Sequence, residues 1–543
     1  MAFLHRYQVL LLASLFPALS LSNHIQQAFL QYNDIPLITF EPSGTTPQVM
    51  DQAVQDALQQ CAVRSFLNGT RYRIISSKIL APAPNAKSTE GQFQSTIYDY
   101  DHARSVFIDG TPSDLSSITV SDANAQPVPN ADELQEAAKI AKLHSSETIG
   151  LSMPPVLSED FADGTSHRIL KLALTSEESS RIVHVNMNNS TLLDETSRSM
   201  KTLACTAPPR ANSSSGDRNP GTMKLQISRR GSVLWTFEAT RPSGSSGTRG
   251  SGIELKNVKY KGKTLLNQAH VPILNVEYDQ PSDGCGPHYR DWQYAELPFQ
   301  CTGQDLADGF RMCSSPAQTI IDSGVDGGNF HGVGIYVQGA ETVLVSQLEA
   351  GWYRYITEWR FHENGTLRPI FGFGAVLEGV GCVCKIHRHH AYWRLDFDIG
   401  TSGGNVVREF NNPPIMGTSN YHDAVYEVQR PRDASHSRHW EVSNVRTGDT
   451  YGIFPGSSDG PSDAFGVGDV WVLRYNPNEL DDGVDQTGGT PEQLMAHIDK
   501  FMNGESVRDQ DVVVWYAGHF RHDQSNDHGE SHRLGPELRP LRW

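Results

Sequence analysis

Three histidines in the second half of the chain have the spacing of metal ligands. His387 and His389 are two residues apart in an extended, apolar stretch, so both imidazoles project from one face of a strand and can reach one ion. His522 follows the apolar run 511–516, which predicts a buried strand ending at a polar loop. His522 can therefore supply a third imidazole to the same metal ion.

Three aspartates form a second candidate metal site. Asp396, Asp398 and Asp511 lie close in sequence to the two histidine groups, and carboxylates are the ligands of a hard cation such as calcium. The pattern therefore predicts two metals of different softness. By itself, however, a His-x-His pair is more typical of hydrogen-bonded or surface histidines on a strand.

The wider C-terminal pattern resembles copper amine oxidases, the secreted quinone enzymes. The resemblance runs from about Val233 to Pro540, includes the segment 252–260, and depends most on four motifs in a fixed order: His387-x-His389, Arg394-Leu395-Asp396-Phe397-Asp398, Asp511-Val512-Val513-Val514-Trp515 and His522. It implies that the three histidines bind copper. It also implies a structural calcium held by Asp396, Phe397, Asp398, Asp511 and Val512, with carbonyl oxygens from Phe397 and Val512.

The resemblance also implies that a tyrosine becomes the quinone cofactor. Tyr353, in the run 351–359, matches the tyrosine that the family converts to topaquinone, but Trp352 and Arg354 replace the usual asparagine and acidic residue. On a strand, residues 352 and 354 point away from the face that carries 353, so the phenol is retained. A cationic Arg354 would disfavour a cationic amine. Without the metal motif, Tyr353 would be interpreted as a core aromatic residue.

The family removes a substrate proton with an aspartate in a Tyr-x-Asp pattern. Tyr289-x-Asp291 fits this pattern and makes Asp291 the candidate base, although a shifted alignment gives the role to Glu296. Either carboxylate would need burial against aromatic rings to raise its pKa towards the working pH.

The resemblance therefore implies oxidative deamination of a primary amine, either a small molecule or a peptide amino terminus, by dioxygen. The products would be an aldehyde, ammonia and hydrogen peroxide, and the enzyme would be a homodimer. Two alternatives remain open. One is a metal-binding glycoprotein that kept the scaffold and lost the quinone, and the other is a zinc hydrolase using water on the three histidines.

Composition and targeting signals agree with a secreted protein. The apolar run Val9–Leu21, followed by small residues, predicts a signal peptide, and no other apolar stretch is long enough to span a membrane. The net charge of −17 argues against nucleic-acid binding. Sequons at Asn68, Asn188, Asn189, Asn212 and Asn364 predict glycosylation.

The seven cysteines predict disulfide bonds in an oxidising compartment, with one thiol left over. Cys301 with Cys313 would close a small loop, whereas Cys382 with Cys384 would be strained at two residues apart. A mixed Cys/His soft-metal site near His387 is conceivable, but the strand parity of these cysteines is opposite to that of the histidines.

The predicted fold is a pair of small α+β domains followed by a large antiparallel β-sandwich catalytic domain. The expected divisions are a signal peptide over 1–22, α+β domains over 23–115 and 116–225, and the copper-binding sandwich over 226–543. Helices are predicted from Thr46 to Cys61 and from about Asn130, and a late packing helix from Thr490 to Gly504. Strands are predicted over 72–79, 93–108, 168–174 and 181–187.

Overall fold

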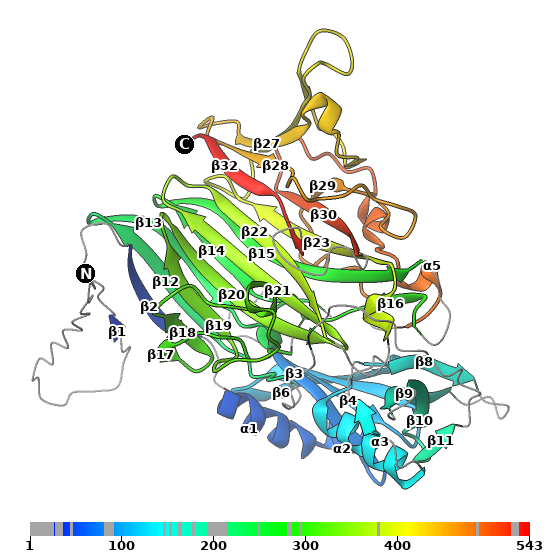
Figure 1. Cartoon of the computed structure of the whole chain (residues 1–543). Coiled ribbons are helices and arrows are strands. Elements are labelled where there is room, and N and C mark those ends of the chain that lie inside the picture. Colours follow the sequence, from blue (N-terminus) through cyan, green and yellow to red (C-terminus); the bar gives the residue numbers. More distant parts are fainter. Residues whose placement is uncertain are drawn as a thin grey trace, which may run out of the picture.

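The computed structural model of the chain consists mainly of β-sheet, with two large sheets and two small ones (Figure 1). It describes residues 26–27, 36–43, 47–80, 92–127, 129–144, 148–150, 155–160, 166–175, 180–193, 208, 216–247, 250–279, 285–293, 295–376, 381–484, 488–522 and 532–543. The predicted signal peptide, the sequon at Asn212 and Cys205 lie outside these residues. No helix within them is long and apolar enough to cross a membrane.

Each small sheet is covered by helix. The four-stranded sheet contains β3 (Tyr72–Leu80), β4 (Gln92–Asp99), β5 (Arg104–Thr111) and β6 (Asp114–Ala123), and packs against α1 (Pro47–Leu58) and α2 (Cys61–Leu67). The five-stranded sheet contains β7 (Thr148–Gly150), β8 (Pro155–Asp160), β9 (Ser166–Thr175), β10 (Ser180–Asn186) and β11 (Thr191–Leu193), under α3 (Ala131–His144). The predicted α+β plan is confirmed, but the expected strand over 93–108 is two strands, β4 and β5.

The first large sheet carries most of the candidate metal ligands. In spatial order its strands are β1 (Gln26–Gln27), β2 (Leu37–Ser43), β12 (Thr222–Arg229), β13 (Ser232–Thr240), β14 (Glu254–Tyr260), β15 (Lys263–Tyr278), β23 (His387–Phe397), β30 (Val512–His522), β29 (Val470–Arg474) and β26 (Val428–Arg430), and β16 (His288–Arg290) pairs with β15. The early strand β2 thus joins strands that are far away in sequence.

The second large sheet carries the candidate quinone precursor. Its order is β17 (Gly303–Ala307), β18 (Phe310–Cys313), β19 (Val333–Gln338), β20 (Glu341–Ala350), β21 (Tyr353–His362), β22 (Leu367–Ala375), β32 (Glu537–Arg542), β28 (Thr450–Phe454), β27 (His439–Asn444), β24 (Asn405–Phe410) and β25 (Tyr421–Asp423), and β31 (Arg533–Leu534) pairs with β22. The short elements are α4 (Ile320–Ser323), α5 (Pro491–Leu494), η1 (Pro242–Gly244), η2 (Gly381–Cys384), η3 (Ala434–His436) and η4 (Ile498–Phe501).

The two large sheets share one apolar core, which makes them a β-sandwich. Trp235 and Trp393 from the first sheet and Trp359 from the second are fully buried in it. The indole of Trp359 also donates a hydrogen bond of 2.9 Å to the carbonyl of Ile253, which ties the sheets together. The expected sandwich is therefore confirmed, and its pairings are antiparallel except for the parallel pair β18 and β19.

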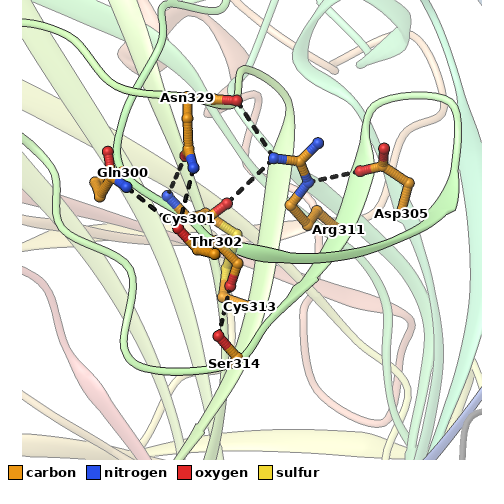
Figure 2. The surroundings of a disulfide bond; sticks show 8 residues. All are labelled: Gln300, Cys301, Thr302, Asp305, Arg311, Cys313, Ser314 and Asn329. Atoms are coloured by element: carbon orange, nitrogen blue, oxygen red, sulfur yellow. Dashed lines mark hydrogen bonds and ion pairs between the residues drawn. A yellow bond between two sulfur atoms is a disulfide. The ribbon is translucent and has the colours of Figure 1, made fainter.

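The predicted disulfide between Cys301 and Cys313 is present and joins the end of β18 to the segment just before β17 (Figure 2). The guanidinium of Arg311 braces the same corner by donating 3.2 Å to the carbonyl of Cys301. A second bridge joins Cys285 to Cys382, and Cys384 is also disulfide-bonded. Cys61 is a free, exposed thiol. These bonds fit an oxidising compartment.

The predicted continuous helix from Thr490 to Gly504 is wrong, because the segment forms only the short turns α5 and η4. In a continuous helix, the carbonyls of Leu494 and Met495 would accept hydrogen bonds from later amides. Here both accept from the buried guanidinium of Arg290, at 2.9 and 2.8 Å. The amide of His497 donates instead to Asp482, at 2.9 Å.

Candidate functional site

Alternation along β23 and β30 places the histidines on two faces of one sheet. Four ring side chains face the core between the two large sheets: His387 and His389 from β23, and Phe520 and His522 from β30. There they contact Tyr353, Phe373 or one another. The intervening residues face the other side, where Tyr392, Val513 and Trp515 form a second core. Because both faces are covered, β30 has the continuous apolar run seen in the sequence.

The three predicted copper ligands are brought together where β23 and β30 end. The strand register pairs His387 with His522, and the Nε2 of His387 lies 3.1 Å from the Nδ1 of His522. The Nδ1 of His387 lies 2.6 Å from the carbonyl of Lys385, which only accepts, so Nδ1 carries the proton and Nε2 keeps its lone pair. Burial lowers the pKa of His387 and of His389 well below the usual value, and the neighbouring histidines lower it further. Both are thus neutral imidazoles, the ligand form.

The spacing of the three histidines shows what a bound ion would require. The ring of His387 is central, with its centroid 4.8 Å from that of His389 and 4.6 Å from that of His522. Within the described residues, there are two sets of three side chains whose donor atoms all lie within 4.8 Å of one another. The three histidines are not one of these sets. The donor chemistry fits copper, and side-chain rotation would have to close the three imidazoles around it.

A small cavity lies beside these histidines. It has a volume of about 20 Å³ and is lined by Tyr353, Phe373, Gly374, Ala375, His389, His522 and His532. This space holds about one water molecule. An amine therefore needs side chains to move before it can reach Tyr353.

Tyr353 lies against the histidines, at the start of β21. Its ring centroid is 4.7 Å from that of His389 and 5.3 Å from that of His387. Its hydroxyl makes a short hydrogen bond with the hydroxyl of Tyr278, from the end of β15. Burial raises the pKa of Tyr353 above its usual value. A neutral phenol is thus held beside the candidate copper ligands.

The prediction that Trp352 points away from Tyr353 is wrong. Gly351 has a φ of 60°, and residues 351 and 352 form a turn before β21, so strand alternation does not apply to Trp352. The indole of Trp352 is buried and donates a hydrogen bond of 3.0 Å to the hydroxyl of Tyr278. Trp352, Tyr278 and Tyr353 thus form one hydrogen-bonded chain.

Trp352→Phe should test this chain with little change in shape. Loss of the indole N–H is expected to lower the free energy of unfolding by about 1 kcal/mol, the usual net contribution of one hydrogen bond. Urea denaturation of the single variants Trp352→Phe and Tyr278→Phe and of the double variant would measure the coupling. Because the two side chains share a bond, the double variant should lose less than the sum, and additive losses would contradict the bond.

Arg354 points away from Tyr353 as expected, but its charge is already neutralised. The buried guanidinium makes two contacts with Asp326, from Nε to Oδ1 at 2.8 Å and from Nη2 to Oδ2 at 3.0 Å. It also donates to the carbonyls of Gly351 and Tyr353, at 3.1 and 3.0 Å. Arg354 therefore fixes the turn that presents Tyr353. With its charge paired, the expected repulsion of a cationic amine loses its basis.

Of the two candidate bases, only Asp291 is linked to the aromatic and histidine group. Asp291 follows β16 and accepts a short hydrogen bond from the hydroxyl of Tyr355, whose oxygen lies 3.3 Å from the Nδ1 of His389. Burial raises the pKa of Asp291 to about 7, although the Tyr355 bond opposes the shift. Glu296 instead accepts from the buried Arg241, which contacts Oε1 at 3.1 Å.

The three predicted calcium carboxylates form one of the two closed donor sets. Asp396, Asp398 and Asp511 place one oxygen each within 4.8 Å of the others, and each has a buried oxygen without a hydrogen-bond partner. Burial raises the pKa of all three, although Arg394 and Asn267 oppose the shift of Asp396. Repulsion from neighbouring carboxylates adds to the effect of burial for the other two, bringing the pKa of Asp398 to about 8 and that of Asp511 to about 7. The register pairs Phe397 with Val512 beside them. Hard oxygen donors that repel each other fit a divalent cation such as calcium.

The mixed Cys/His metal site is excluded by the disulfides. Cys382 is bonded to Cys285, and Cys384 is also disulfide-bonded. Neither sulfur is therefore a thiolate, the form that binds metal.

Three further residues of the site were missed in the sequence, and one named residue was misplaced. Tyr278, Tyr355 and His532 are buried beside the predicted residues, and Trp352 was assigned to the wrong face. Tyr355 had a usable signal, because it lies two residues after Tyr353 on the same strand face. Tyr278 and His532 had none, since only the tertiary fold brings them to Tyr353.

Comparisons with known proteins agree on the fold. No protein-family model and no curated protein matches the sequence. Among solved structures, a copper-containing benzylamine oxidase from Hansenula polymorpha has a TM-score of 0.59 at 14% identity, over 94% of this chain and 98% of that one. An amine oxidase from Aspergillus nidulans gives 0.56 at 12%, over 95% and 90%. Pichia pastoris lysyl oxidase gives 0.55 at 11%, over 91% and 89%. The chain thus has the fold of these copper amine oxidases.

Proposed function

We propose that the protein is a copper-dependent primary amine oxidase in which Tyr353 is the precursor of a quinone cofactor. The observation that carries the proposal is the position of Tyr353. Its buried phenol lies against His387 and His389, and Tyr355 connects this group to the buried carboxyl of Asp291. The shared fold supports the same class of reaction.

Each of the surrounding residues has a distinct task. His387, His389 and His522 would hold copper, and a quinone formed from Tyr353 would supply two-electron redox chemistry between the amine and dioxygen. Asp291 removes the proton on the carbon next to nitrogen, a task suited to a carboxyl whose pKa is about 7. Tyr278 and Trp352 orient the ring oxygen of residue 353 through their hydrogen bonds.

The overall reaction would convert a primary amine, dioxygen and water into an aldehyde, ammonia and hydrogen peroxide. The two electrons and two protons lost by the amine would reduce dioxygen to the peroxide, and water would release the nitrogen as ammonia. A small amine or a peptide amino terminus fits this scheme. Since the cavity is only about 20 Å³, substrate entry requires displacement of a lining side chain.

The carboxylate set Asp396, Asp398 and Asp511 is proposed to hold a structural calcium, together with carbonyl oxygens of Phe397 and Val512. We also propose a secreted, glycosylated homodimer. Three sequon asparagines, Asn68, Asn189 and Asn364, are exposed and accessible to a glycan. The homodimer remains a prediction from the resemblance.

A second candidate function is a metal-binding glycoprotein on the same scaffold without a quinone. It is favoured by the tight packing around Tyr353, where Trp352 and Tyr278 occupy the neighbouring space and the cavity admits about one water.

Copper loading in air would distinguish the two candidates. The purified protein should develop a visible band that reacts with a hydrazine, and Tyr353→Phe should bind copper without the band. Tyr451→Phe is a matched control, because Tyr451 is a buried tyrosine of β28 that donates 2.7 Å to the carbonyl of Gly365. A wild-type protein that binds copper and stays colourless would overturn the oxidase and favour the second candidate.

A further inference from the structure

The outer face of β23 carries a second histidine cluster that the proposed reaction does not use. His390 alternates with the inward-facing residues of β23 and is fully buried. Two carboxylates lie close to it, those of Glu277 from β15 and Asp463 from the loop before β29. One donor atom of each residue lies within 4.8 Å of the other two. This is the second closed donor set within the described part of the chain.

The hydrogen bonds of His390 identify which of its nitrogens faces the carboxylates. The Nε2 of His519 lies 3.0 Å from the carbonyl of Gly468 and 3.2 Å from a carboxylate oxygen of Asp469, so it must carry a proton. The Nδ1 of His519 lies 2.8 Å from the Nδ1 of His390, so this contact engages the Nδ1 of His390.

The Nε2 of His390 is therefore the ring nitrogen that is left to face the carboxylates. This atom is buried and has no hydrogen-bond partner, yet it lies 3.7 Å from Oδ1 of Asp463. A buried polar atom without a partner is costly, and a cation between this nitrogen and the carboxylate would give both of them a partner. A ring N–H bound to a second group, with the other nitrogen free, is the usual arrangement of a metal-binding histidine.

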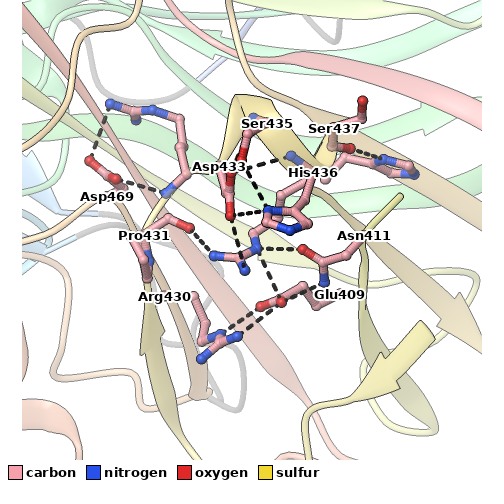
Figure 3. Close-up of polar contacts among 12 residues, drawn as sticks. Glu409, Asn411, Arg430, Pro431, Asp433, Ser435, His436, Ser437 and Asp469 are labelled. Carbon is pink, nitrogen blue, oxygen red and sulfur yellow. Dashed lines mark hydrogen bonds and ion pairs between the residues drawn. The ribbon is translucent and has the colours of Figure 1, made fainter. Parts of the chain in front are cut away.

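The outer residues hold the set in place. The Nδ1 of His390 would collide at 2.8 Å with a Cβ at residue 466, and glycine there leaves room for the histidine pair. Asp463 accepts from the amides of Phe465 and Gly466, at 3.1 and 2.7 Å. Asp469 also accepts from the amide of Arg432, at 2.7 Å, next to the network of Glu409, Arg430 and Asp433 (Figure 3).

The charge of the cluster leaves room for a divalent ion. Three carboxylates surround Arg388: Asp279, Glu277 at 3.7 Å and Asp463 at 3.5 Å. One guanidinium leaves a formal charge of −2. The side chains of Glu277 and Asp463 are 26% and 29% exposed, so the ion could enter from solvent and keep a water ligand.

We propose that Glu277, His390 and Asp463 form a binding site for a divalent transition metal of the zinc type. One imidazole and two carboxylates are typical zinc donors, and a water would complete four-coordination. The site is on the opposite face of β23 from the copper histidines, so it requires neither copper nor the quinone. It gives the protein a third metal position, of structural or regulatory use.

Zinc binding to the whole protein tests this site directly. Protein loaded with copper and kept in excess calcium should bind one further zinc ion, with copper content unchanged. Glu277→Gln and Asp463→Asn should each weaken that binding by at least about tenfold. Asp279→Asn is the matched control, because it removes a carboxylate that contacts Arg388 outside the donor set and should bind zinc like the wild type.

His390→Gln gives a fourth arm, and circular dichroism would show that each variant is folded. Zinc binding that is equal in the wild type, Glu277→Gln and Asp463→Asn would overturn the proposal, as would no zinc beyond the copper and calcium positions. Anomalous scattering at the zinc edge should place the ion beside Nε2 of His390. Zinc found only at His387, His389 and His522 would also overturn it.

Discussion

Asp291→Asn should lower kcat by about 10²- to 10⁴-fold, the usual contribution of a positioned general base. The amide has nearly the shape of the carboxyl and can still accept the hydrogen bond from Tyr355, but it cannot take a proton from carbon. Stopped-flow reduction of the cofactor by an amine would measure the loss. The hydrazine-reactive band should persist, because Tyr353 and the histidines are unchanged.

The pH profile gives this prediction a second readout. Burial raises the pKa of Asp291 to about 7 in the folded protein, and only the ionised form is a base. The kcat/KM of the wild type should therefore fall as the pH decreases through about 7, and Asp291→Asn should lose that limb of the profile. A limb near pH 7 that survives in Asp291→Asn would assign the base to another group.

Glu296→Gln is the natural comparison, because Glu296 is the other candidate in the same segment. It is buried in an ion pair with Arg241, which also contacts Asp217 at 2.6 Å. Its replacement should lower the free energy of unfolding and leave the acid limb of the profile in place. A large loss of kcat with unchanged stability in Glu296→Gln would reverse the assignment.

Local sequence patterns predicted the ligand-bearing strands because each pattern has a direct physical cause. The His387-x-His389 spacing works through strand alternation, and the run 511–516 is apolar because both faces of β30 are covered. The helix beginning at Pro47 was predicted from a proline in the first turn followed by an amphipathic run, and α1 begins at Pro47.

The errors arose where tertiary contacts replaced local rules. Trp352 was given the alternation of a strand, but the turn at Gly351 places its indole on Tyr278. The helix at Thr490 ends early because Arg290, about 200 positions earlier in the chain, donates hydrogen bonds to its backbone carbonyl groups. Nothing in the local sequence indicates either partner. The partners of His390 likewise come from three separate segments, which carry Glu277, Asp463 and His519.

We expect the carboxylates of Asp396, Asp398 and Asp511 to make stability depend on a bound cation. The carboxylates of the buried Asp396 and of the half-buried Asp398 and Asp511 place one oxygen each within 4.8 Å of the others, with Arg394 3.8 Å from Asp396 as a partial counter-charge. Without a cation, their repulsion opposes folding. A calcium ion would bind the folded state only, because the unfolded chain separates Asp511 from the other two.

Calcium at about 100 times its dissociation constant should therefore raise the free energy of unfolding by about 2.7 kcal/mol over that in excess chelator. Urea denaturation with and without calcium, on copper-loaded protein, would measure the difference.

Asp398→Asn should act in opposite directions in the two conditions. It removes one repelling charge, so the chelated protein becomes more stable than the chelated wild type, and it removes a ligand, so the response to calcium shrinks. Asp305→Asn, at an exposed pair with Arg311, should keep the full response. A wild type equally stable in calcium and in chelator would show that these carboxylates hold no calcium.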